Sequence, residues 1–147
     1  NPKHGVKEVF GQAVNSEGVV GKKIWGKRAD WVHYFGKIDG KPAGIAFLSH
    51  PSNSSKNNQK AWWHARDYGL ISANPFAPER MGGDGGRTIP KGQSLGFRYQ
   101  IIFHSFDNHE GAKIEQRFAK YAKTPAHPTS IMPPHPGYPE EYLAKNK

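Results

Sequence analysis

Alternating apolar and polar positions dominate the chain and predict β-strands. Residues 31–35 and 44–48 are rich in aromatic and β-branched side chains, and Asp39-Gly40 between them is a strong hairpin-turn signal. Residues 6–14 predict an earlier strand, which the turn residues at 15–18 end. The first half of the chain therefore predicts antiparallel β-structure.

The clearest alternation spans residues 95–103. One face of this predicted strand is apolar and carries Leu95, Phe97, Tyr99 and Ile101. Because successive side chains in a strand point to opposite faces, Arg98 and Gln100 lie on the other face. We expect the Arg98 guanidinium to pair with a carboxylate near the site described below, or to face the pocket itself.

Helical spacing appears only near the C-terminus. Ile114, Phe118 and Tyr121 recur at helical intervals within residues 107–122, and Asp107 and Asn108 are candidate N-caps. From residue 124 onward, frequent proline favours an extended tail. We expect an all-β fold, a β-sandwich or the larger part of one, over residues 1–123, with one short C-terminal helix and a Pro-rich tail over 124–147.

The composition limits the class of protein. A chain of 147 residues with 35% hydrophobic content, 17 Gly and 12 Pro is long enough for one loop-rich domain. No apolar run approaches the roughly 20 residues that cross a bilayer, so we expect a soluble protein without a membrane partner. The absence of Cys excludes disulfides, thiolate catalysis and Cys-based metal sites.

The formal charge of +9 and the isoelectric point near 9.8 raise the question of nucleic-acid binding. The densest basic patch is short and contains Lys22, Lys23, Lys27 and Arg28. The other cations are dispersed along the chain, and no zinc-finger, RNP or basic-helix signature is present. We interpret the charge as a solvated basic surface, without nucleic acid as the main partner.

A dense group of polar and aromatic residues lies between positions 50 and 76. Imidazole, guanidinium, carboxylate, phenol, carboxamide and indole groups occur together there, which is typical of a polar pocket with aromatic walls. Pro51 and Gly69 bend the chain at the two ends of this segment, and the polar run at 52–60 is too hydrophilic to be buried. We therefore expect one concave site.

Residues in this site have different expected roles. Asp67 is the candidate general base, His64 the candidate acid or orienting group, and Arg98 the third candidate catalytic residue. The candidate substrate-binding residues are His50, Asn53, Trp63, Arg66, Tyr68 and Asn74.

His50 and His64 are also candidate ligands of a divalent metal, with Asp67 as a third ligand, because imidazole and carboxylate suit zinc or non-haem iron. Their spacing matches no known metal motif. The alternative interpretation is that both histidines bind loop backbone through hydrogen bonds.

The remaining aromatic and histidine residues have simpler interpretations. We expect Trp25 and Trp31 in the core, because each lies in or beside a strand-like stretch. His104 and His109 are interpreted as surface or loop residues, whereas His33 faces either the pocket or solvent, and the sequence does not decide between these.

Several ordered motifs carry a resemblance to a known family. They are Asn15-Ser16-Glu17-Gly18, Trp25-Gly26-Lys27-Arg28-Ala29-Asp30-Trp31, Gly44-Ile45-Ala46, His50-Pro51-Ser52-Asn53, Trp63-His64-Ala65-Arg66-Asp67-Tyr68-Gly69 and Asn74-Pro75-Phe76. The chain resembles, from about Asn15 to His104, the C-terminal part of a bacterial family labelled methane oxygenase PmoA. The resemblance implies that N-terminal strands are missing here or that a partner chain completes the domain.

This resemblance implies that the ligand or substrate is a carbohydrate and not methane. A membrane oxygenase subunit needs spanning segments, which the sequence lacks. Members of the family resemble soluble, often exported β-sandwich proteins that are encoded beside sugar-processing oxidoreductases. The residues of the segment agree, since indole and phenol rings stack on sugar C–H faces while carboxamide and charged groups bind hydroxyls.

Different function classes therefore remain open. An enzyme that acts on sugars predicts that Asp67, His64 and Arg98 converge, with a perturbed carboxylate. A lectin-like binding module predicts aromatic stacking without a proton-transfer pair. A metal-dependent oxygenase or hydrolase predicts a metal on His50 and His64, and a non-catalytic structural or interaction protein predicts none of these features.

Overall fold

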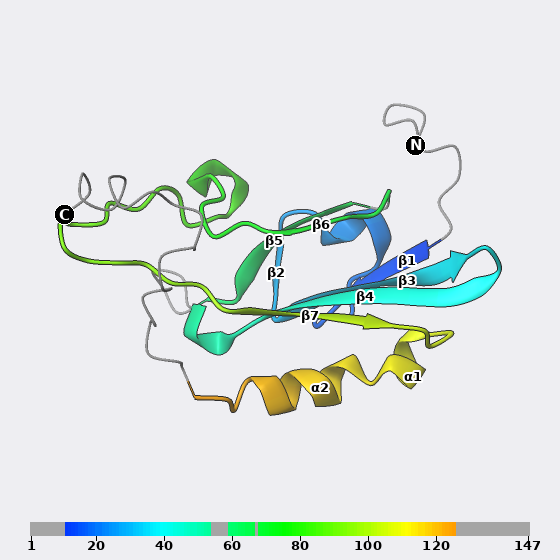
Figure 1. Ribbon diagram of the computed structural model, residues 1–147. Helices are drawn as coiled ribbons and strands as arrows, with labels where there is room; N and C mark the ends of the chain where they lie inside the picture. The colour runs from blue at the N-terminus through cyan, green and yellow to red at the C-terminus, as the bar shows by residue number, and fades with distance from the viewer. Residues whose placement is uncertain (1–10, 54–58, 67, 126–147) are drawn as a thin grey trace, which may run out of the picture.

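The chain folds into three layers (Figure 1). The computed structural model describes residues 11–53, 59–66 and 68–125. A three-stranded sheet packs on one face of a four-stranded sheet, and a short helical layer covers the other face of the four-stranded sheet. This arrangement confirms the expected all-β architecture with a short C-terminal helical segment.

The larger sheet, called sheet A here, is fully antiparallel. Its strands lie in the order β1 (Gly11–Asn15), β3 (Trp31–Ile38), β4 (Lys41–Ser49) and β7 (Tyr99–His104). Asp39 and Gly40 join β3 to β4, and both have positive φ, 51° and 74°. Such a two-residue turn matches the twist of a hairpin, which confirms the turn predicted from Asp-Gly.

The smaller sheet, called sheet B, is also antiparallel. It contains β2 (Lys27–Ala29), β5 (Ala61–Arg66) and β6 (Leu70–Ala73), with β5 in the centre. In the described residues, short 3₁₀ turns connect the strands of the two sheets: η2 (Gly21–Ile24), η3 (Pro51–Asn53) and η4 (Glu79–Met81).

Alternate residues of sheet A serve two different cores. Val32 is buried between the sheets with Trp63 and Ala65 of β5. Its neighbour Trp31 points the other way and is buried with Leu48 against the helical layer. The buried Trp63 indole N–H donates to the Ala29 carbonyl at 2.9 Å, so the largest side chain of the first core leaves no unpaired donor.

The helical layer is broken in two. Helix α1 (His109–Ala112) ends at Lys113, whose φ of 50° is left-handed, and helix α2 (Ile114–Tyr121) starts directly after it. The Asn108 side chain accepts a hydrogen bond from Gly111 N, which confirms Asn108 as the N-cap. Ala112 and Ile114 are both buried against sheet A. The break at Lys113 therefore lies between the two residues that anchor this layer.

Strand β7 lies at the end of sheet A and is shorter than residues 95–103 predicted. On its face toward the sheet-B side, Ile101 and Phe103 are 50% and 77% exposed. Sheet B has fewer strands and packs over the other end of sheet A. The expectation that N-terminal strands are missing or that a partner chain completes the domain stays a prediction.

Two further expectations concern the remaining tryptophans and the tail. Trp31 is buried as predicted, whereas Trp25 is only half-buried and stacks edge to face with Trp62, with ring centroids 5.8 Å apart. The predicted Pro-rich tail lies almost wholly outside the described residues. Among the described residues, no helix is long and apolar enough to cross a membrane.

Candidate functional site

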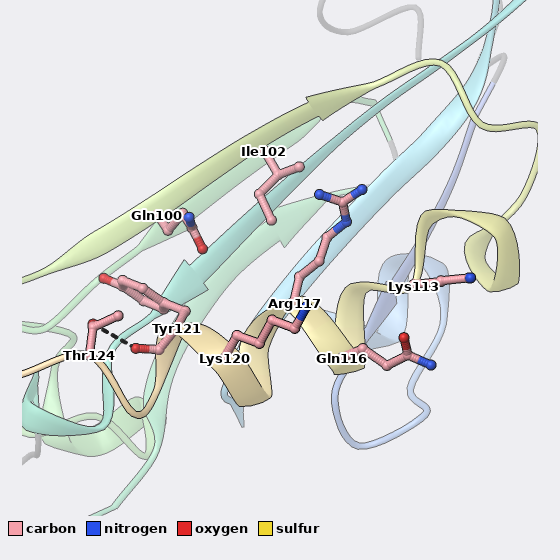
Figure 2. Close-up of a pocket in the computed structure, with 8 residues that line it drawn as sticks. All are labelled: Gln100, Ile102, Lys113, Gln116, Arg117, Lys120, Tyr121 and Thr124. Atoms are coloured by element: carbon pink, nitrogen blue, oxygen red, sulfur yellow. Dashed lines mark hydrogen bonds between the residues drawn. The ribbon is translucent and has the colours of Figure 1, made fainter.

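A concave groove lies between β7 and α2 (Figure 2). This groove has a volume of about 610 Å³, enough for a ligand of several rings. It is lined by Gln100, Ile102, Lys113, Gln116, Arg117, Lys120, Tyr121 and Thr124. We call these residues and the space between them the β7–α2 groove.

Helical spacing explains why cations gather in this groove. Ile114 and Phe118 face sheet A, and the positions one residue before and two residues after each of them lie on the side of the helix that borders the groove. Lys113, Arg117 and Lys120 occupy such positions, and among the described residues none that lines the groove is acidic. The groove therefore presents a positive potential to any ligand that enters it.

Arg117 is held in place rather than free to rotate. Its Nε donates to the Ala112 carbonyl at 2.9 Å, which satisfies a carbonyl at the end of α1. Figure 2 shows its guanidinium rising from α2 toward β7 beside Ile102. A fixed guanidinium offers planar, paired donors to a carboxylate, sulfate or phosphate.

Arg98 extends the basic character at the other end of the groove. Its Nη2 donates to Thr124 Oγ1 at 3.1 Å, and its guanidinium carbon lies 5.9 Å from the centre of the Tyr121 ring. Thr124 and Tyr121 both line the groove. Among the described residues no carboxylate pairs with Arg98: Asp84 pairs with Arg28, and Glu17 pairs with Lys60. A pairing with Asp67, which lies outside the described residues, stays a prediction.

His50 lies beside Arg98 with its protons fixed by neighbours. Its Nδ1 accepts the Ser52 backbone N–H at 3.1 Å, so Nε2 carries the ring proton and donates to the Thr124 carbonyl at 3.1 Å. Arg98 Nη1 is 3.3 Å from the same Nε2, which places two N–H groups against each other. Burial first, and then the Arg98 charge, lower the pKa of His50.

Asn53 fixes the backbone of residue 98. Its Oδ1 accepts the Arg98 N–H at 2.6 Å, and its Nδ2 donates to the Arg98 carbonyl, which also accepts the His50 N–H. The side chain of Asn53 thus imitates a strand partner for Arg98. Its role in the structure is to position the arginine and the turn at Pro51–Asn53.

A second polar cluster lies at the α1 end of sheet A. His33, on β3, is fully buried and lies between His104 of β7 and His109 of α1. The Nε2 atoms of His33 and His104 are 2.8 Å apart, and the Nδ1 atoms of His33 and His109 are 2.9 Å apart. We call these residues the histidine chain.

His104 and His109, interpreted from the sequence as surface or loop residues, are half-buried, and the sequence interpretation missed their hydrogen bonds to the buried His33. The missed signal was that His33 shares a strand face with Trp31 and Phe35, so burial was to be expected there. A buried imidazole needs hydrogen-bond partners, and these come from residues more than 70 positions away.

His64 and Arg66 lie on the outer face of sheet B. The His64 ring is in edge contact with Trp25 and Trp62, and the Arg66 guanidinium carbon lies 4.9 Å from the centre of the Trp25 ring. Burial and the nearby Arg66 charge lower the pKa of His64. Trp63 points the other way into the core, so its predicted contact with a substrate is wrong.

The structure therefore does not bring the predicted site residues together. His50, Asn53 and Arg98 meet at the end of the β7–α2 groove, on the helix side of sheet A. His64 and Arg66 lie beyond sheet B, because β5 turns its inner face to the core through Trp63 and Ala65. The expected loop from residue 50 back to residue 64 joins two different layers.

The other predicted residues are also dispersed. Asn74 N donates to the Trp62 carbonyl, and the Asn74 side chain accepts the Phe76 N–H, which is a turn-forming contact. Tyr68 lies at the turn between β5 and β6. The candidate base Asp67 lies outside the described residues.

The geometry also bears on the predicted metal. His50 and His64 are in different layers, and both ring nitrogens of His50 already make hydrogen bonds. In the histidine chain, nitrogens 2.8–2.9 Å apart are closer than the roughly 3.3 Å that two tetrahedral zinc ligands require. Among the described residues, no group of three or more His or acidic side chains is arranged to hold a metal ion.

Comparison with known families matches residues 4–119 to a family described as "Family of unknown function (DUF6807)". The chain belongs to this family. Neither the curated proteins nor the solved structures give a match. The description of this family names no activity. The match does not support the methane-oxygenase label.

Proposed function

We propose that this protein binds a carbohydrate that carries acidic groups, in the β7–α2 groove. The observation that carries the proposal is the composition of the groove wall: Lys113, Arg117 and Lys120 lie on one side, and no acidic residue lines the groove in the part of the chain that the structure describes. Such a site attracts anions and gives little favourable interaction with a cation.

The polar groups beside these cations suit a sugar. Gln100 and Gln116 offer carboxamides that both donate and accept hydrogen bonds, which matches the paired hydroxyls of a saccharide. The Tyr121 ring borders the same space and offers an aromatic face for sugar C–H groups. The resemblance to the PmoA-labelled bacterial family, with its link to sugar-processing enzymes, supports the same ligand class.

The wall of the groove favours binding over glycoside hydrolysis. Most glycosidases need two carboxyl groups on either side of the scissile bond. No carboxyl group of residues 11–53, 59–66 or 68–125 lines the groove, and the imidazole beside it, His50, uses its Nδ1 lone pair to accept the Ser52 N–H. Of the classes that the sequence left open, a lectin-like binding module fits this site best.

The proposal is tested by calorimetric titration with an oligo-uronate and with its neutral counterpart, in which the carboxyl groups are reduced to alcohols. We expect the acidic oligosaccharide to bind, with an affinity that falls as salt rises, and the neutral one to bind at least tenfold more weakly. The charge-reversal variant K113E/K120E should lose at least tenfold in affinity. A matched control, K22E/K23E, changes net charge equally on η2 and should bind as the wild type does.

Two outcomes would overturn this proposal. Equal affinity of the two variants would show that the attraction comes from the overall positive charge and not from the groove. Tighter binding of a single-stranded oligonucleotide than of the oligo-uronate, lost in K113E/K120E, would assign the groove to nucleic-acid phosphates.

A further inference from the structure

The histidine chain is not used by the proposed binding site. It joins three separate elements, β3, β7 and α1, through a residue that is 0% exposed. The His33 ring stacks on Phe35 with centroids 4.8 Å apart, so no water is needed to complete its packing. Both of its nitrogens face other imidazoles, which is a restrictive way to satisfy a buried ring.

One backbone contact determines where the protons of the chain lie. The Phe106 N–H donates to His104 Nδ1 at 3.1 Å, so His104 carries its proton on Nε2 and donates to His33 Nε2. His33 then carries its proton on Nδ1 and donates to His109 Nδ1. The neutral chain therefore has one arrangement of protons that satisfies all three contacts.

An additional proton breaks this arrangement wherever it binds. On His109 Nδ1 it would face the His33 Nδ1 proton, and on His33 Nε2 it would face the His104 Nε2 proton. On His104 Nδ1 it would face the Phe106 N–H. At each position the added proton turns a hydrogen-bond acceptor into a donor that faces another donor. The three hydrogen bonds therefore form together only while all three imidazole rings are neutral.

The charges around the chain also oppose protonation. Burial lowers the pKa of His33 to about 3, with further contributions from His104 and His109. Burial and the positive charge of Arg117 on α2 lower the pKa of His104. The carboxylate nearest to the cluster on α2, Glu115, accepts the Trp31 indole N–H at 3.2 Å, and the Trp31 ring packs on His109.

We propose that the histidine chain is an acid-sensitive clasp that holds α1 against sheet A and releases it when the chain takes up a proton. Once the clasp opens, the contacts that still hold α1 among the described residues include its cap at Asn108, the burial of Ala112 and Ile114, the Trp31–Glu115 contact, and the hydrogen bond from Arg117 to the Ala112 carbonyl. Because α1 leads through Lys113 into the wall of the groove, release also weakens ligand binding, and this last step rests on the proposed function.

The first test reads the protons directly in the unmodified protein. Long-range ¹H–¹⁵N NMR spectra at pH 7.5 should show the Nε2–H tautomer for His104, Nδ1–H for His33 and Nε2–H for His109. A His33 ring with its proton on Nε2, or a charged His33 at this pH, would contradict the clasp without any variant being made.

The second test follows α1 as the pH falls. Between pH 7.5 and 5, the hydrogen-exchange protection of the Ala112 amide should fall at least fivefold, and the Trp31 indole resonance should shift, whereas the Trp63 indole in the other core should not change. In H33F, which keeps an aromatic ring against Phe35, both responses should disappear. H109Q alters only the half-exposed end of the chain and should give the same loss of response if H33F folds poorly. The control H64F, which removes the imidazole on the outer face of sheet B, should respond as the wild type does.

A wild-type response that persists in H109Q and H33F would overturn the clasp. These measurements contain no ligand, so they are independent of whether the groove binds a carbohydrate. If α1 is released in acid but the affinity for the oligo-uronate stays constant between pH 7.5 and 5, the clasp stands and its coupling to the groove is wrong.

Discussion

The two faces of sheet A are built from the same strands and have opposite chemistry. The face toward sheet B is apolar and includes Val32, Tyr34 and Phe47. The face toward the helices contains an apolar centre, but its two ends carry His33 and Gln100 together with other polar groups. Because side chains alternate along a strand, one residue of sheet A contributes to the core between the sheets, while the next residue in sequence contributes to the helix face.

We therefore expect the face toward sheet B to determine the stability of the fold and the helix face to determine ligand binding. The face between the sheets places large side chains at full burial, so changes there reduce the free energy of unfolding. The helix face combines a buried centre with an open groove, so changes in the groove alter binding while the fold remains. The following substitutions test this division.

The largest loss of stability is expected from W63A. Trp63 is fully buried between the sheets and donates to the Ala29 carbonyl, so its removal opens a cavity and leaves an acceptor unpaired. We expect the free energy of unfolding to fall by about 3–5 kcal/mol. Urea unfolding at pH 7.5 measures this loss; a change below about 1 kcal/mol would show that the two sheets do not share this core.

The second effect is a pH dependence that comes from the helix face. The pKa of His33 is lowered to about 3 in the folded chain, while an unfolded histidine titrates near 6.5. The unfolded state therefore binds more protons between these values, and this contribution is fully present above pH 6.5 and is lost progressively as the pH falls toward 3. We expect the free energy of unfolding to fall by up to about 1.4 kcal/mol per pH unit from this group.

Comparison of H33F with the wild type isolates that contribution. The difference between their urea midpoints should shrink or reverse as the pH falls from 7.5 to 5, because the variant has no group to protonate at this position. A difference that is constant with pH would assign the acid response to other residues.

A smaller effect is expected from W31F, at the boundary between the two kinds of surface. The substitution retains an aromatic ring against Leu48 but removes the indole N–H that donates to Glu115 at 3.2 Å. We expect a loss of roughly 1 kcal/mol in stability, with the helical layer affected more than the sheets. Hydrogen exchange of Ile114 compared with Ala65 distinguishes a local change from a global one.

The smallest effect is expected from H64A. The sequence predicts that this residue acts in catalysis, but the structure places it on the outer face of sheet B, away from the groove. We expect affinity for the oligo-uronate to stay within twofold of the wild type, with a stability change below about 1 kcal/mol. A tenfold loss of affinity for the oligo-uronate would show that the binding site lies on the outer face of sheet B and not in the groove.

The fold was predictable from the sequence because local signals decide it. Asp39-Gly40 defined the β3–β4 hairpin, Asn108 defined the start of the helical layer, and alternation located the two central strands. The break at Lys113 was not predicted, because a left-handed residue at a lysine follows from burial of Ala112 and Ile114 on each side.

The site was less predictable because it depends on which layer each strand joins. The residues from His50 to Asn74 are close in sequence, but β4 belongs to sheet A and β5 to sheet B, so His50 and His64 separate. In contrast, Lys113, Arg117 and Lys120 had a readable helical spacing that the sequence interpretation treated as dispersed charge. The histidine chain was not predictable from local sequence patterns, because it depends on contacts between residues more than 70 positions apart.

The central claim is that ligand recognition belongs to the helix face of sheet A. The most direct measurement is a ¹H–¹⁵N correlation spectrum of the protein at pH 7.5, titrated with the oligo-uronate. The account predicts that the largest shifts fall on Gln100, Lys113, Arg117 and Lys120, with His64 and Arg66 unchanged. Shifts centred on His64, Arg66 and Trp25, with the groove residues unmoved, would contradict it.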